Sequence, residues 1–221
     1  GLVPVEANMT DLRRTEGGST ASRMIIVLLS IMVAFGVGIW SGLMMGGLRE
    51  LRGASALRSD PLDLPRLNAQ VDAAESDFML LGDARVAHWA PLPVIDSARF
   101  ASIGASGMTA VQMELAARIL ADRFEGKTVV IQIGINDLKS IGYMDRSSEE
   151  IISETKRALA AIHRTLAKSG AKVYISTIIP PGPITLARRP IWSERIRDAV
   201  VSVNEALVSG HLMPVRAVIN F

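Results

Sequence analysis

The chain has 221 residues, of which 49% are hydrophobic and 21% are charged, and this composition excludes a wholly disordered protein. Cysteine is absent, which excludes a disulfide scaffold, a cysteine-ligated metal site and a thiol nucleophile. The 24 basic and 22 acidic residues leave a net charge of +2, so no strongly basic surface for nucleic acid is expected.

One long apolar segment dominates the N-terminal part. Residues 24–47 contain no charged residue, and Trp40 lies near one end, where interfacial aromatic residues are favoured. About 20 apolar residues are enough for a helix to cross a bilayer. The segment therefore predicts a transmembrane helix that anchors the chain in a membrane, which is its expected binding partner.

Two other interpretations of this segment remain open. A buried core helix rarely runs so long without a charge. A cleaved signal peptide normally has an apolar region of about 7–15 residues. Ala54-Ser55-Ala56 does offer a cleavage site for a signal peptidase, but the charged residues Arg49, Glu50 and Arg52 precede it.

The segments that flank the apolar stretch are polar. Residues 1–23 are predicted to form a disordered tail, with Met9 as a candidate initiator, and residues 48–75 are predicted to form a linker that contains Pro61 and Pro65. Three arginines lie on either side of the apolar segment: Arg13, Arg14 and Arg23 before it, and Arg49, Arg52 and Arg58 after it. The positive-inside rule therefore leaves the orientation open.

From residue 76 onward, short apolar runs alternate with helical patterns. Strands are predicted at 78–81, 100–103, 128–133 and 172–179, and a further apolar run covers 215–221. Helices are predicted at 109–124, from a capping box of Ser147 and Glu150 up to Gly170, and at 192–208. Such alternation predicts one α/β domain over residues 76–221 with a parallel sheet and helices on both faces.

Three clusters follow predicted strands, where ligands bind in parallel sheets. They are Gly82-Asp83-Ala84, Gly104, and Gly134-Ile135-Asn136-Asp137. In this order they resemble the SGNH/GDSL hydrolase family, over roughly residues 76–221. The resemblance implies a three-layer αβα sandwich and hydrolysis of an acyl or acetyl ester of a lipid or carbohydrate, without a cofactor.

The resemblance also implies roles for these residues. Ala84 stands at the position of the family's nucleophilic serine, and its N–H, the Gly104 N–H and the Asn136 side chain correspond to the oxyanion hole. Gly82, Asp83, Gly134 and Asp137 are supporting residues, and the two aspartates are expected to bond backbone amides. By similarity to anchored hydrolases, the domain is expected on the periplasmic or extracellular side of a bacterial inner membrane.

The sequence departs from the family twice. Ala84 has no oxygen with which to form an acyl-enzyme, and no Asp-x-x-His block follows near the C-terminus. We therefore expect an esterase that is inactive as written and C-terminally incomplete at Phe221, with an apolar stripe of its sheet left uncovered. A noncatalytic protein that binds a glycan or acyl group and a membrane-anchored structural module remain alternatives.

Other residues are weaker candidates for the missing groups. Ser106 is expected to be a turn residue, His88 a surface residue, His163 a structural helix residue and His211 a loop residue. The histidines and carboxylates show no spacing typical of a metal site.

Overall fold

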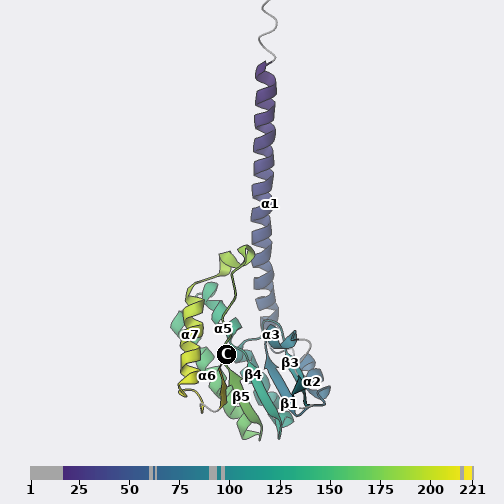
Figure 1. The fold of residues 1–221 in the computed structure, drawn as a ribbon, viewed down its shortest axis with the longest axis vertical. Helices are drawn as coiled ribbons and strands as arrows, with labels where there is room; N and C mark the ends of the chain where they lie inside the picture. Colours follow the sequence, from purple (N-terminus) through teal and green to yellow (C-terminus); the bar gives the residue numbers. More distant parts are fainter. Residues whose placement is uncertain are drawn as a thin grey trace, which may run out of the picture.

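A six-stranded sheet with the order β2-β3-β1-β4-β5-β6 is the centre of the computed structural model, which describes residues 17–59, 62, 64–89, 94–95, 98–214 and 217–220. The parallel strands are β1 (Phe78–Gly82), β3 (Ala98–Gly104), β4 (Thr128–Gln132), β5 (Lys172–Ser176) and β6 (Val218–Ile219). Strand β2 (Val94–Ile95) pairs antiparallel with β3. The sheet confirms the predicted α/β class (Figure 1).

Helices alternate with the parallel strands. They are α1 (Gly17–Ser59), α2 (Leu64–Asp72), α3 (Ala84–Ala87), α4 (Ala110–Leu120), α5 (Ile135–Lys139), α6 (Ser148–Lys168) and α7 (Arg195–Val208), with 3₁₀ turns η1 (Ala121–Phe124), η2 (Ser140–Gly142) and η3 (Leu186–Ile191). Helix α6 packs against α4 and α7, whereas α2 and α3 contact β3.

Local sequence explains the best-defined elements. Strand β4 is paired on both sides, and its β-branched Val129 and Ile131 are fully buried, as expected for a central parallel strand. The predicted capping box at Ser147 and Glu150 begins α6. Buried Glu114 of α4 accepts hydrogen bonds from Arg118 and, across the helix interface, from Arg157 of α6.

The predicted linker of residues 48–75 contains more regular structure than its polar composition suggested. Helix α1 continues to Ser59, and α2 follows with Leu67 and Val71 buried in the core of the domain. The polar composition hid this helix because α2 has only nine residues, of which two, Leu67 and Val71, are apolar and buried. These two side chains lie four positions apart on one face of the helix, which is enough to hold it on the domain. The predicted disordered tail includes residues 17–23, which are helical, and residues 1–16, which lie outside the described residues.

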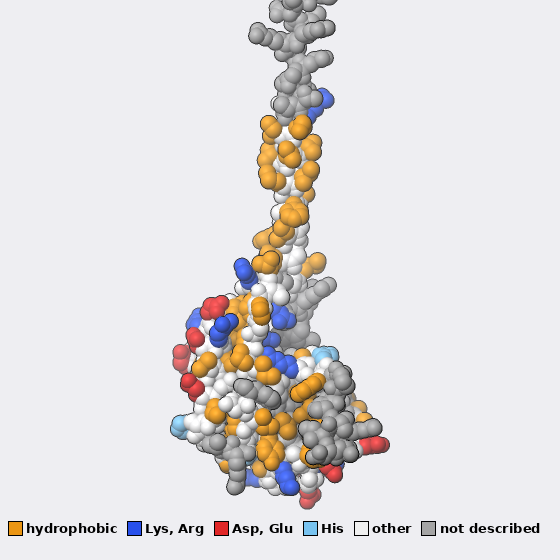
Figure 2. Space-filling model, in the orientation of Figure 1, with side chains coloured by type: hydrophobic (Ala, Val, Ile, Leu, Met, Phe, Trp, Pro, Cys, Tyr) orange, Lys and Arg blue, Asp and Glu red, His pale blue; other side chains and the backbone are white. Residues whose placement is uncertain are grey.

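Helix α1 extends away from the domain (Figure 1). Its segment Ser22–Leu48 is long and apolar enough to span a membrane. Every residue from Ser22 to Gly42 is exposed, including Phe35 (70%) and Trp40 (65%), so this part of the helix packs no face against the rest of the chain. Figure 2 shows the apolar side chains on its visible face. This exposure excludes the alternative of a buried core helix.

One predicted strand ends earlier than expected, and one predicted helix begins later than expected. Strand β5 stops at Ser176, and helix α7 starts at Arg195, with the unpredicted turn η3 before it. Thr177 still donates its N–H to the Ile219 carbonyl oxygen of β6 at 2.8 Å. The next residue, Ile178, is held instead by Asn204 of α7, whose side chain bonds both its N–H and its carbonyl oxygen. Of the apolar run at 215–221, Val218 and Ile219 form β6, and residues 215, 216 and 221 lie outside the described residues.

The position of α2 in the core can be tested by substitution. Leu67 is 1% exposed, so Leu67→Ala should lower the free energy of unfolding by about 2–5 kcal/mol, measured by urea unfolding of the detergent-solubilised chain. Leu115→Ala, at a helical leucine that is 46% exposed, is the matched control and should change it by no more than about 0.5 kcal/mol. Equal losses in both variants would show that α2 is not part of the core.

Candidate functional site

The three motif clusters lie side by side at the carboxyl edge of the sheet. Strand β1 lies between β3 and β4, and Gly82 at its end is in register with Gly104 and with Gln132. Each cluster begins within two residues of one of these strand ends. The structure therefore brings together the three segments that the sequence separates by 20 to 30 residues.

Glycine at the ends of β1 and β3 is required by close backbone approach. A Cβ added to Gly82 would lie 2.2 Å from the carbonyl oxygen of Gln132, and one added to Gly104 would lie 2.3 Å from that of Gly82. Neither neighbour is a flexible side chain, so any larger residue would push the strands apart. Gly134, which precedes α5, has φ +118° and so also requires glycine.

The two aspartates bond backbone amides at helix N-termini. Asp83 is 1% exposed and caps α3, with its Oδ1 accepting a hydrogen bond from the Arg85 N–H at 2.9 Å. Asp137 is also buried, and its carboxylate accepts from Ala110 N–H at 2.7 Å and from Val111 N–H at 3.4 Å. Asp137 therefore ties the start of α4 to α5.

Burial changes the acidity of both carboxyl groups. Desolvation raises the pKa of Asp83, although the Arg85 N–H and guanidinium oppose it. Desolvation likewise raises the pKa of Asp137 to about 7, against the backbone hydrogen bonds that favour its ionised form. The Oδ2 atom of Asp83 is buried and has no hydrogen-bond partner among the described residues, which fits a carboxyl group that resists ionisation.

Ala84 is the first residue of α3 and lies directly after the Asp83 cap. Its N–H group makes no hydrogen bond to any described residue, as is usual for the first turn of a helix. The position is thus able to offer a backbone donor, but its methyl side chain offers no nucleophile.

The N–H of Gly104 is already engaged within the chain. It donates to Oε1 of Gln70 in α2 at 3.0 Å, and the Gly104 carbonyl oxygen accepts from Gln70 Nε2 at 3.2 Å. Gly107, three residues later, has φ +81°, and its N–H has no acceptor among the described residues. Gly107 was not among the predicted site residues, although the pair Ser106-Gly107 in a turn before the capped helix α4 was a usable signal.

Asn136 connects the end of β4 to this loop. Its Nδ2 donates to the Met108 carbonyl oxygen at 2.9 Å, and its Oδ1 accepts from Lys139 Nζ at 3.4 Å. A side-chain amide has two N–H donors, so one remains for a ligand. The Met108 contact fixes the amide beside the loop that carries Gly107.

The structure also pairs two residues that no sequence pattern connects. His88, which follows α3, and Ser106, in the loop after β3, are joined by a hydrogen bond of 2.8 Å between Nε2 and Oγ. Both side chains are in the exposed part of the site. With Nε2 as acceptor, His88 would be in its Nδ1–H form, in which it can take the serine proton.

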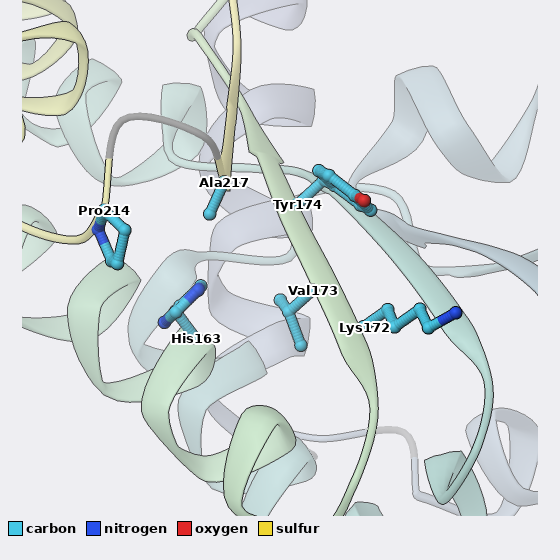
Figure 3. Close-up of a pocket in the computed structure, with 6 residues that line it drawn as sticks. All are labelled: His163, Lys172, Val173, Tyr174, Pro214 and Ala217. Carbon is cyan, nitrogen blue, oxygen red and sulfur yellow. The ribbon is translucent and has the colours of Figure 1, made fainter.

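The other two histidines lie elsewhere. His211 Nδ1 is 2.5 Å from Ser209 Oγ in an exposed turn after α7. Burial lowers the pKa of His163 in α6, which faces β5 across a hollow of about 410 Å³ (Figure 3). Lys172, the first residue of β5, lines the same hollow. The hollow therefore lies toward the amino ends of the parallel strands, whereas the motif clusters lie at their carboxyl ends. Within the described ranges, no three histidine or carboxylate side chains are placed to hold a metal ion.

Comparison with known proteins identifies one family. The model of the GDSL-like lipase/acylhydrolase family matches residues 53–217. No curated protein sequence matches the chain.

Several solved structures are similar at low identity. The esterase EstA from Pseudoalteromonas sp. is 16% identical, with 65% of this chain and 76% of that chain covered and a TM-score of 0.44. A putative platelet activating factor from Streptococcus pneumonia is 14% identical, with 76% and 79% covered and a TM-score of 0.48. A catalytic mutant of Axe2, an acetylxylan esterase from Geobacillus stearothermophilus, is 18% identical, with 60% and 73% covered and a TM-score of 0.34.

The raised pKa of Asp137 predicts a pH dependence of stability. Between about pH 4 and pH 7 the folded chain holds this proton and the unfolded chain does not, so stability falls as the pH rises through this window. Asp137→Asn cannot ionise, and its free energy of unfolding relative to the wild type should therefore rise by up to about 1.4 kcal/mol per pH unit across the window.

Urea unfolding at several pH values measures this difference. Asp145→Asn, at an exposed aspartate, is the matched control and should leave the pH profile unchanged. A constant difference between wild type and Asp137→Asn from pH 4 to pH 7 would contradict the raised pKa.

Proposed function

The chain belongs to the GDSL-like lipase/acylhydrolase family, and from this membership we propose that it is a membrane-anchored domain that binds an acyl or acetyl ester of a lipid or carbohydrate at the carboxyl ends of β1, β3 and β4. As written, it does not hydrolyse the ester by the family's route. The observation that carries this proposal is Ala84, a residue without an oxygen placed between otherwise intact strand-end clusters.

Three unfilled donors support ester binding at this edge. They are the backbone N–H groups of Ala84 and Gly107 and the second N–H of the Asn136 side chain. Donors of this kind bind a carbonyl oxygen, and they stabilise it further when it becomes an oxyanion. Because the Gly104 N–H is bonded to Gln70, we assign the loop donor to Gly107, and Gly104 acts through strand packing.

Two groups that the family uses for turnover are not found in these 221 residues. Covalent ester hydrolysis requires a nucleophile and a base that takes its proton. Position 84 is alanine, and the 221 residues contain no Asp-x-x-His block. We therefore propose that the site binds the carbonyl group of an ester without cleaving the ester.

Binding without turnover is directly testable. The chain should bind an acetylated xylo-oligosaccharide more tightly than the same oligosaccharide after alkaline deacetylation, measured by calorimetry in detergent. It should not hydrolyse that ligand, or p-nitrophenyl acetate, above background. Asn136→Ala should weaken binding about fivefold, since one hydrogen bond is worth about 1 kcal/mol. Asn220→Ala, beyond β6, is the control. Equal affinity for both oligosaccharides would contradict an ester site of this class.

A second candidate function, favoured by the contact between His88 and Ser106, is ester hydrolysis from a different nucleophile. Ser106 Oγ would attack the carbonyl carbon while its proton moves to His88 Nε2. The imidazolium would return that proton to the departing alcohol oxygen, and a water molecule would then release the acid in the same way.

A serine-directed fluorophosphonate probe distinguishes the two functions. Binding without turnover predicts no labelling. Hydrolysis from Ser106 predicts labelling that is lost in Ser106→Ala and kept in Ser209→Ala, which removes the second exposed serine–histidine contact. Labelling with this pattern would replace the first function by the second.

The membrane anchor is part of the proposal. The span Ser22–Leu48 supports an uncleaved transmembrane helix more strongly than a signal peptide, because α1 continues beyond the span and contacts η3 of the domain. Cleavage after Ala56 would remove that contact. We assign the domain to the side of the membrane opposite the N-terminus, which is the periplasmic or extracellular side.

This topology predicts two results. The chain should remain in the membrane fraction through carbonate extraction, and protease added to intact spheroplasts should digest the domain predicted at residues 76–221. A cytoplasmic protein in the same preparation is the control for intact membranes. Protection of the domain until the membrane is lysed would reverse the assigned side.

A further inference from the structure

A contact between α1 and the domain shields the apolar span near its end. Among the described side chains of Ser22–Leu48, all are exposed except Leu43, Gly46 and Gly47, of which Gly47 is buried. The turn η3 contacts α1, and Figure 1 shows it beside the helix at the end of the domain nearest the span.

The length of the span fixes the depth of this contact, if α1 is the membrane anchor proposed above. A span of 27 residues is about 40 Å long, whereas the hydrocarbon core is about 30 Å thick. Counting about 20 residues from Met24 places the far boundary of the hydrocarbon near Leu43. Leu43 to Leu48 therefore lie at the level of the lipid headgroups, and η3 lies at the same level.

The side chains of η3 suit that environment. Leu186 is 62% exposed although it is a large aliphatic residue, and Arg188 and Arg189 are both exposed. Residues 180–197 contain four basic residues and one acidic residue, Glu194. Figure 2 shows basic side chains at the end of the domain that adjoins α1, with acidic side chains beside some of them. An apolar side chain next to cations is the combination that binds an anionic membrane surface.

The segment that carries η3 is also fastened to the candidate site. Asn204 holds Ile178 by two hydrogen bonds, and Arg85 Nη1 donates to the Ile179 carbonyl oxygen at 2.7 Å. Arg85 is the residue after Ala84 in the first turn of α3. The segment that leads into η3 is thus fixed at its start to the carboxyl edge of the sheet.

We propose that η3 is a second membrane contact, which inserts Leu186 at the interface and places Arg188 and Arg189 against the phosphates of anionic lipids. Together with α1 it holds the domain in one orientation, with the carboxyl edge of the sheet toward the bilayer. The ester group that reaches the site is then one carried at the membrane surface, on a lipid or on a molecule attached to a lipid.

Single-cysteine labelling tests this contact, because the chain has no native cysteine. Leu186→Cys carries the polarity-sensitive fluorophore NBD, and the full chain is reconstituted in vesicles of phosphatidylcholine and phosphatidylglycerol that contain headgroup-nitroxide lipid. The label at 186 should be quenched and blue-shifted. Ile119→Cys, at an exposed residue near the far end of α4, should show neither effect.

The charge requirement is tested in the same system. Replacing both arginines, with Arg188→Gln and Arg189→Gln, should lower the equilibrium constant for docking of η3 about 25-fold. Each cation at an anionic surface contributes about fivefold, and the two factors multiply. Vesicles of phosphatidylcholine alone should give a similar loss. Quenching at 186 that is insensitive to both changes would overturn the role assigned to the arginines.

A third label separates this inference from the proposed anchor. Phe35→Cys lies in the middle of the span and is 70% exposed in the chain alone, so its label should be quenched by lipids with a nitroxide on the acyl chain. Quenching at 35 without quenching at 186 would overturn the contact by η3 and leave the anchor in place. Absence of quenching at 35 would overturn both.

Discussion

The close approach of three strand ends is the constraint on which the site depends. Gly82 is paired with Gly104 on one side and Gln132 on the other, and a Cβ at either glycine would meet a backbone carbonyl oxygen within 2.3 Å. Because these contacts are backbone to backbone, no change of rotamer relieves them. The segments that follow the strands therefore start from fixed and adjacent points, which is why short loops are enough to bring Ala84, Gly107 and Asn136 to one edge.

Buried polar groups then fix those segments. Asp137 joins α5 to α4, Asn136 joins it to the loop at Met108, and Gln70 joins α2 to Gly104. Each of these contacts satisfies backbone groups that would otherwise be buried without a partner, at a cost of about 1–3 kcal/mol for each group. Asp137 is buried, and desolvation of its carboxylate raises its pKa to about 7, so part of the stabilisation is lost when it ionises.

Elements with a local cause could be predicted from the sequence. Strands β1 and β4 have continuous apolar runs that end at glycine or a polar residue, and α6 has a complete capping box. The sequence could not reveal α2 or η3, because both depend on partners far along the chain. Helix α2 is held by the burial of Leu67 and Val71 in the core of the domain, and η3 lies in contact with α1. The pair of His88 and Ser106 was missed for the same reason: its geometry depends on the pairing of β1 with β3, and neither residue has a local signature.

The site also explains why a family motif is weak evidence for activity in this chain. Gly82 and Gly104 are required for strand packing, Asp83 caps α3, and Asp137 and Asn136 hold α4 and its loop. All five residues would therefore be needed by a protein of this fold that performed no catalysis. At position 84, by contrast, a side-chain hydroxyl has no such role, since the cap of α3 is supplied by Asp83 and the helix begins equally well with alanine. A change from serine to alanine there would remove the nucleophile of the family and leave the architecture of the proposed carbonyl-binding site.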